Sequence, residues 1–218
     1  MSRPIARHVV VFVRAPRLGQ VKSRLAAGIG ALPALRFYRE ITARVLTILG
    51  RDPRWRTVVA ITPPRARFDR FPERSLPRLD QGRGDLGRRM AYAFRVLPPG
   101  RTVIVGSDIP ALAPRHIAAA FRALGNHDAV FGPARDGGYW LIGLKRSRPL
   151  PAGLFEGVRW SSPHALADTR ANLPRWFSVM LLETLEDVDD DRSYRRWRAR
   201  EALRSRRRAF SEAPAGAA

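Results

Sequence analysis

The chain has 218 residues, and its 45% hydrophobic content predicts one domain with a full apolar core. It has no cysteine, which excludes disulfides and thiolate metal sites, so any metal must be held by oxygen or by histidine nitrogen. The formal charge of +21 favours anionic partners, but only Lys22 and Lys145 of the 40 basic residues are lysines, which indicates a chain-wide preference for arginine and makes lysine the more informative residue.

The first predicted element is a strand over residues 8–13, a β-branched run typical of a strand buried on both faces. A loop with Pro16 and Gly19 leads into a helix from residue 21, and apolar residues at three- and four-residue steps predict a second helix over 32–49. Residues 57–62 form the next predicted strand, and residues 63–78 show no clear period. Farther on, the patterns predict helices at 84–97, 114–124, 162–173 and 192–208 and strands at 102–105, 129–132, 139–144 and 177–182.

Strands and helices that alternate at this spacing predict an α/β fold, a three-layer α/β/α arrangement around a mostly parallel sheet. The strands at 129–132 and 139–144, joined by a Gly-Gly turn, are candidates for an antiparallel pair. We expect a single domain over residues 1–209 and a flexible tail over 210–218. Ligands of such sheets bind at the carboxyl ends of the strands, where the polar candidates of this sequence lie.

Residues 14–24 combine a glycine-containing loop, a helix start and two cations after the first strand. Amides at a helix start carry partial positive charge, and Lys22 and Arg24 add full charges, so a phosphate group fits this segment. A surface turn with two solvated cations is the alternative. Because nearly all other basic residues of the chain are arginines, the lysine at position 22 indicates that a compact ammonium is needed there, which favours the phosphate site.

Acidic residues follow two of the predicted strands. Asp108 comes after the strand that ends at residue 105, while Asp187 and Asp189 follow the last strand and share one side if extended. Because Mg²⁺ and Mn²⁺ suit a few carboxylates together with substrate oxygens, these aspartates predict a divalent-cation site. The alternatives are a turn cap at Asp108 and a solvated helix start farther on, where Asp190 or Asp191 is expected to cap the terminal helix.

Two further segments carry polar residues among glycines. Asp136 precedes Gly137 and Gly138 in the turn between two predicted strands, where an acid–base role competes with an ordinary hairpin turn. Gln81 and Asp85 lie in a glycine-spaced segment, residues 81–87, that lets the backbone approach a flat ligand.

Six segments, taken together and in this order, resemble one family: residues 15–25, 84–87, 106–110, 132–144, 160–163 and 187–189. The family is the bacterial glycosyltransferase-like group known as radical-SAM/selenodomain-associated transferases, within the nucleotide-diphospho-sugar transferase superfamily, which has the type-A glycosyltransferase fold. The resemblance covers about residues 8–195. More distantly, the chain is similar to 2-phospholactate guanylyltransferase, through Asp108, the turn over 136–138, and Asp187 with Asp189.

The resemblance implies that segment 81–87 faces a nucleotide base and that Asp136 faces the acceptor or the sugar. It implies the catalytic residues Lys22, Asp108 and Asp136, and the Mg²⁺ or Mn²⁺ ligands Asp108, Asp187 and Asp189. The implied nucleotide-binding residues are Arg14, Pro16, Gly19, Lys22, Arg24, Gln81, Gly84, Asp85 and Ser107. One departure is that Gly106-Ser107-Asp108 lacks the first acid of the Asp-X-Asp motif of sugar-nucleotide transferases, so it is closer to the nucleotidyltransferase pattern.

Two reactions therefore stay open. In glycosyl transfer, an acceptor attacks the sugar carbon while a metal-bound nucleotide leaves, and the family resemblance favours this reaction. In nucleotidyl transfer, a phosphorylated small molecule attacks the α-phosphorus of a nucleoside triphosphate, and the Asp108 pattern favours that one. A third interpretation makes the basic helix a nucleic-acid or membrane contact, but the arginine bias favours a solvated helix that docks through Tyr194, Trp197 and Leu203.

The expected partners are a nucleotide or nucleotide-sugar and a small-molecule acceptor, without nucleic acid. No run approaches the roughly 20 apolar residues of a membrane-spanning helix, and residues 1–8 lack the apolar centre of a secretion signal. We therefore expect a cytoplasmic protein with no membrane span. The sequence leaves open whether the protein forms a homo-oligomer.

Overall fold

The structure is a computed structural model that describes residues 6–63 and 76–211. The expected tail thus lies outside the described residues from 212 onward, as do residues 64–75 of the aperiodic segment. In the described part, the elements in chain order are β1 (Arg7–Arg14), α1 (Ser23–Ile29), α2 (Ala31–Gly50), β2 (Arg56–Thr62), β3 (Arg78–Asp80), α3 (Leu86–Val96), β4 (Arg101–Gly106), α4 (Pro114–Asn126), β5 (Ala129–Pro133), β6 (Tyr139–Leu144), α5 (Ala165–Ala171), β7 (Val179–Leu181) and α6 (Asp191–Ser211).

The described strands form one sheet in the order β3-β2-β1-β4-β6-β5-β7. β1 pairs in parallel with β2 and β4, β2 with β3, and β5 with β7. β6 pairs antiparallel with both β4 and β5, so it alone runs against the others. This confirms the predicted fold class, a mostly parallel sheet with an antiparallel strand, and it brings the carboxyl ends of six strands to one edge.

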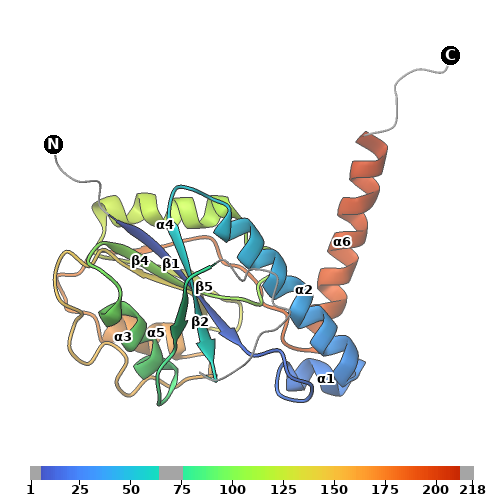
Figure 1. The fold of residues 1–218 in the computed structure, drawn as a ribbon, viewed down its shortest axis with the longest axis horizontal. Coiled ribbons are helices and arrows are strands. Elements are labelled where there is room, and N and C mark those ends of the chain that lie inside the picture. The colour runs from blue at the N-terminus through green and yellow to red at the C-terminus, as the bar shows by residue number, and fades with distance from the viewer. Residues whose placement is uncertain (1–5, 64–75, 212–218) are drawn as a thin grey trace.

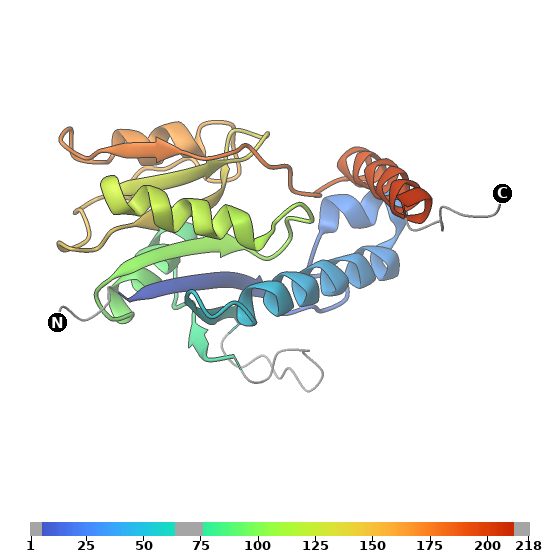
Figure 2. The same ribbon diagram turned by 90° about the horizontal axis from the view of Figure 1, so that it is seen from above.

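Helices cover both faces of the sheet because the strands are apolar on both faces. Val9 and Val11 of β1 belong to a core that includes residues of α2 and α4. Val10 points to the opposite core, which includes Met90 and Phe94 of α3. Phe94 is fully buried on that side, and burying a side chain of this size contributes roughly 2–3 kcal/mol of hydrophobic free energy. The layers are visible in Figure 1, with α4 above the sheet and α3 and α5 below it, and Figure 2 looks onto the sheet from the side of α4.

The terminal helix α6 begins at the predicted place. The Asp190 carboxylate accepts a hydrogen bond from the Ser193 N–H at 2.7 Å, which satisfies a free amide of the first turn and confirms the expected cap. Tyr194 and Trp197 pack on Phe37 of α2, with ring centroids 5.3 and 4.9 Å apart, respectively. The second half of α6 projects away from the body (Figure 1). The expected docking of Leu203 is wrong, because that side chain lies on the projecting half and is 59% exposed.

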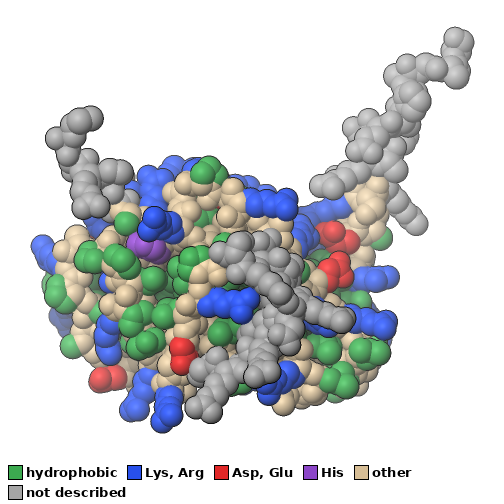
Figure 3. All heavy atoms as spheres, in the orientation of Figure 1, with side chains coloured by type: hydrophobic (Ala, Val, Ile, Leu, Met, Phe, Trp, Pro, Cys, Tyr) green, Lys and Arg blue, Asp and Glu red, His purple; other side chains and the backbone are tan. Residues whose placement is uncertain are grey.

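Basic side chains are spread over the surface. On the face drawn in Figure 3, Lys and Arg side chains are scattered among hydrophobic and neutral ones and do not form one continuous patch. Neither residues 6–63 nor residues 76–211 contain a helix with the length and apolar character needed to cross a bilayer.

One buried histidine makes stability depend on pH. The His116 Nδ1 atom, near the start of α4, accepts a hydrogen bond from the Ala113 N–H at 3.1 Å. Burial lowers the pKa of His116 and the Arg115 charge lowers it further, whereas Glu183 opposes the shift. Below about pH 6.5, the pKa of a histidine in the unfolded chain, His116 binds a proton more readily in the unfolded chain than in the folded protein. The free energy of unfolding therefore decreases as the pH falls below about 6.5.

We expect the unfolding free energy to fall less between about pH 7 and about pH 5 in His116→Asn than in the parent protein, by urea denaturation at each pH. Asparagine keeps an acceptor for the Ala113 amide but does not titrate. His8, whose pKa is also lowered by burial and then by Arg146 and Arg56, remains in both proteins, so part of the fall persists. Parallel pH profiles would contradict this assignment.

Candidate functional site

Four aspartates gather at the carboxyl edge of the sheet. β1 and β4 are neighbours in register, with Phe12 opposite Gly106, so the loop after β1 and the Asp108 segment emerge side by side. A parallel bridge between Ala134 and Leu185 brings the chain after β7 next to the turn that carries Asp136. Asp187 and Asp189 follow that bridge, so segments distant in the sequence share this edge.

Lys22 lies at the centre of this group. Its Nζ atom is 2.7 Å from Asp108 Oδ2 and 3.1 Å from Asp189 Oδ1, and its side chain is only 3% exposed. Burial alone would lower the pKa of Lys22, but the two carboxylates outweigh burial and raise it, so the ammonium stays charged. The Arg24 guanidinium lies 3.5 Å from Asp189 on the open side, and its side chain is 72% exposed.

The backbone of Lys22 is unusual as well. Lys22 adopts a left-handed conformation, with φ 52° and ψ 47°, directly before α1, and its carbonyl accepts the Ala26 amide. A side chain with a Cβ atom costs about 1–2 kcal/mol in that region, so the surrounding contacts must hold it there. Val21 and Leu25 on either side are buried and anchor the turn.

Asp187 has the most perturbed carboxyl group of the site. Burial, followed by the charge of Asp108, raises the pKa of Asp187 to about 6; Asp136 and Asp189 add to the shift, and Lys22 opposes it. Converging carboxylates that Lys22 does not fully neutralise are a suitable environment for a hard divalent cation. The described residues hold no preformed cluster of three or more acidic, His or Cys ligands. A Mg²⁺ or Mn²⁺ ion that takes part of its coordination from substrate and water would fit a donor set drawn from Asp108, Asp187 and Asp189.

Tyr38 of α2 ties the two central strand ends together, a role that sequence reasoning missed. Its hydroxyl accepts from the Arg14 N–H at 3.0 Å, donates to the Arg14 carbonyl at 2.9 Å, and lies 3.4 Å from Ser107 Oγ. The three- and four-residue steps of the helix predicted over 32–49 include Tyr38 and predict only that it faces inward, without indicating these hydrogen bonds. Ser107 is 3% exposed with its hydroxyl toward α2, so only its backbone faces the site.

The segment before α3 is largely occupied by structural contacts. Gln81 donates to the Val13 carbonyl at 3.1 Å and the Ala60 carbonyl at 2.9 Å, so both of its amide hydrogens are already used. Asp85 caps α3 by accepting from the Arg88 N–H at 2.8 Å. The Gln81 amide could donate a hydrogen bond to a nucleotide base only if one of its hydrogen bonds to the Val13 and Ala60 carbonyls broke. An open hollow lies beside this helix start, between α3 and residues 150–157.

The remaining predicted residues lie on the rim of the site. Asp136 Oδ1 accepts from the Gly138 N–H at 2.9 Å, and the residue is exposed. The Arg14 guanidinium donates to the Gln20 carbonyl at 3.3 Å and so braces the loop that carries Pro16 and Gly19. Gly19 has φ 73° and open space where a Cβ would lie, so the backbone there is accessible to a ligand.

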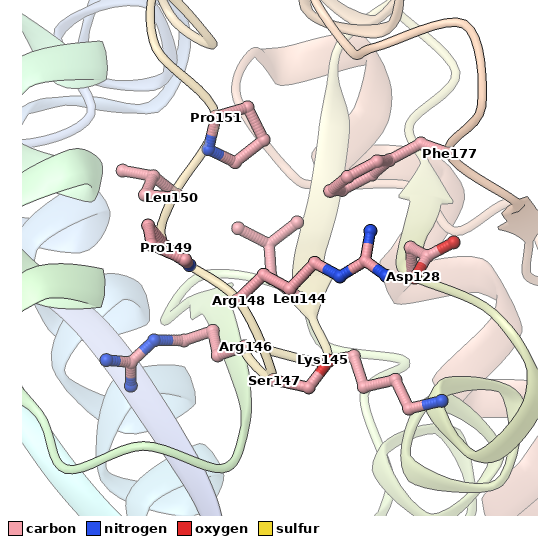
Figure 4. A pocket seen from close by; sticks show the side chains of 10 residues that line it. All are labelled: Asp128, Leu144, Lys145, Arg146, Ser147, Arg148, Pro149, Leu150, Pro151 and Phe177. Carbon is pink, nitrogen blue, oxygen red and sulfur yellow. The ribbon is translucent and has the colours of Figure 1, made fainter.

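The second lysine of the chain has a structural role. Lys145 lines a hollow at the end of β6 (Figure 4). Because β6 runs in reverse, this end lies at the opposite edge of the sheet. The Lys145 Nζ donates to the Gly125 carbonyl at 3.3 Å, and Arg146 donates to the Leu97 and Pro98 carbonyls, so both side chains point away from the hollow. Lys22 is therefore the lysine that lies among acids at the ligand-binding edge.

Solved structures share this fold. A provisionally assigned nucleotide-diphospho-sugar transferase from Desulfovibrio desulfuricans is 29% identical over 84% of this chain and 82% of its own, with a TM-score of 0.75. The 4-diphosphocytidyl-2C-methyl-D-erythritol synthase from Anaerococcus prevotii is 10% identical over 86% and 92% of the two chains, with a TM-score of 0.58. Glucosyl-3-phosphoglycerate synthase from Mycobacterium tuberculosis, bound to Mn²⁺, UDP and glucosyl-3-phosphoglycerate, is 10% identical over 85% and 72%, with a TM-score of 0.53.

At 10% identity the second and third of these structures show the fold alone. Among curated proteins, none matches the chain. Residues 45–162, more than half of the 218, match the family described as "Uncharacterized protein conserved in bacteria (DUF2064)", and the chain belongs to this family.

Proposed function

We propose that the protein is a divalent-cation-dependent transferase that binds a nucleotide-sugar and transfers its sugar to a small-molecule acceptor. The observation that carries the proposal is the buried Lys22 ammonium between Asp108 and Asp189 at the carboxyl edge of the sheet. A cation beside paired carboxylates at such an edge suits a ligand that brings both phosphates and a metal ion. The solved structure with 29% identity, described as a nucleotide-diphospho-sugar transferase, supports the same substrate class.

In the proposed reaction, Lys22, Arg24 and the amides at the start of α1 bind the diphosphate and offset the charge that develops as the nucleotide leaves. Asp108, together with Asp187 and Asp189, would hold a Mg²⁺ or Mn²⁺ ion, which would supply Lewis-acid stabilisation of the leaving phosphates. Asp136 Oδ2, the oxygen not engaged by Gly138, would accept the proton of the acceptor hydroxyl. The Mn²⁺ in the glucosyl-3-phosphoglycerate synthase complex supports the metal assignment.

Nucleotidyl transfer is the second candidate, and one observation favours it. Only one acidic residue, Asp108, lies in the segment directly after β4, because position 106 is glycine and the Ser107 side chain is buried against α2. With one strand-end carboxylate, the site suits a metal ion shared with the α-phosphate of a nucleoside triphosphate. The fold likeness to 4-diphosphocytidyl-2C-methyl-D-erythritol synthase is consistent with this alternative.

A thermal-shift comparison tests the proposal. We expect a sugar nucleotide with Mn²⁺ to raise the melting temperature by about 5–10 °C when present at about 100 times its dissociation constant, because preferential binding to the folded state adds about 2.7 kcal/mol. The same ligand without Mn²⁺ should give a smaller shift. A larger Mn²⁺-dependent shift with a nucleoside triphosphate would favour nucleotidyl transfer, and no shift with any nucleotide would refute both reactions.

A further inference from the structure

We propose that Lys22 occupies the cation position between Asp108 and Asp189 in the nucleotide-free protein, and that a divalent cation binds there only when the ammonium moves away, a movement that nucleotide phosphates favour. The inference rests on the proposed function, because it assigns Lys22 two alternative partners within that site. It predicts that the lysine opposes metal binding and supports nucleotide binding, which are opposite effects of one side chain.

The geometry of the pairing supports occupation by lysine. Asp108 Oδ2 and Asp189 Oδ1 both lie within hydrogen-bonding distance of one nitrogen, at 2.7 and 3.1 Å, and two of the three ammonium N–H groups can serve them. The ammonium thus lies where an ion shared by these carboxylates would lie. Two positive charges cannot share a position so close to the same oxygens, so cation and lysine must compete there.

The burial pattern shows which side of the pair is open. The Lys22 side chain is 3% exposed, whereas Asp108 is 33% and Asp189 48% exposed. Solvent and ligands therefore reach the carboxylates from the side opposite the lysine stem.

The lysine also joins parts of the chain that are far apart. Its bond to Asp189 spans 167 positions and links the start of α1 to the segment before α6. The two helices are also in tight contact near the end of α1, since a Cβ on Gly28 would lie 2.5 Å from the Cβ of Asp191. A purely structural ion pair would explain this link equally well, so the experiment must separate the two roles.

Mn²⁺ binding to the full-length protein, measured by the electron paramagnetic resonance signal of free Mn²⁺, provides that separation. Lys22→Met keeps an unbranched side chain as far as the ε-carbon and removes the charged nitrogen. We expect it to raise the affinity for Mn²⁺ without nucleotide by about tenfold or more and to lower the affinity for a nucleoside diphosphate. Lys145→Met is the matched control, because it makes the same substitution at the opposite edge of the sheet, where Lys145 donates to the Gly125 carbonyl, and its Mn²⁺ affinity should change less than about threefold.

A second measurement uses the wild-type protein, in case the variant does not fold. The chain has two lysines, so amine acetylation read by mass spectrometry compares Lys22 with Lys145 as an internal reference. Saturating Mn²⁺ without nucleotide should raise the acetylation rate of Lys22 relative to Lys145.

Unchanged or weaker Mn²⁺ binding in Lys22→Met, or a Lys22 that stays protected while Mn²⁺ is bound, would overturn the inference. If wild-type protein still binds Mn²⁺ together with a nucleotide, the proposed function survives that result. If it binds neither, both fail.

Discussion

Replacing Asp108 with alanine is expected to abolish Mn²⁺-dependent nucleotide binding while the protein stays folded. Asp108 approaches Lys22 more closely than Asp189 does and is one-third exposed, so the change removes a ligand and an ion-pair partner without removing core volume. Residues that merely orient metal ligands are worth about 10–100-fold in metal affinity, so loss of a ligand itself should cost about 100-fold or more. Calorimetric titration of a sugar nucleotide with and without Mn²⁺ measures this loss.

Asp52→Ala is a suitable control for that experiment. Asp52 also pairs with an arginine, with its carboxylate 2.6 Å from the Arg54 guanidinium, but it precedes β2 and thus lies at the opposite edge of the sheet. Both substitutions change the net charge equally, so a general electrostatic effect would appear in both proteins. Unchanged Mn²⁺-dependent affinity in Asp108→Ala would show that the cation, if bound, is held elsewhere.

The strands and the acids that follow them could be predicted because both depend on local pattern. An uninterrupted apolar run such as Val9 to Val13 is typical of a central strand in a sheet that helices cover on both faces. An acidic residue that follows such a strand, as Asp108 follows β4, then lies at the carboxyl edge of the sheet. β3 could not be predicted. It comprises only Arg78–Asp80 at the edge of the sheet, with half-buried or exposed side chains that carry no apolar pattern.

The contacts within the site could be predicted only in part. Lys22, Asp108 and Asp189 were each singled out, but that the lysine bridges the two acids depends on how three distant segments meet, which no local pattern encodes. The inward orientations of Ser107 and Gln81 were missed for the same reason. A polar residue beside a glycine at the end of a strand predicts a contact with a ligand. Ser107 and Gln81 instead form hydrogen bonds with buried polar groups of α2, β1 and β2.

Replacing Gly137 with alanine is expected to destabilise the protein by about 2–4 kcal/mol, because strain and overpacking add. Gly137 has φ 87°, and a Cβ there would lie 2.2 Å from the carbonyl oxygen of Pro163, a backbone atom that cannot rotate away. Its carbonyl also accepts the Leu166 N–H at 3.2 Å, so the turn and the start of α5 cannot separate freely. The melting temperature should fall by about 5–15 °C in a domain of this size.

Gly157→Ala separates the two causes of that loss. Gly157 has φ 64°, but a Cβ there would meet nothing within 4 Å, so its replacement adds backbone strain of about 1 kcal/mol and no overpacking. Urea denaturation of both variants should therefore show the larger loss at Gly137, and equal losses would mean that the contact with Pro163 relaxes at little cost. Because Asp136 precedes Gly137 directly, Gly137→Ala should also weaken whatever step depends on Asp136, measured at a temperature where both variants remain folded.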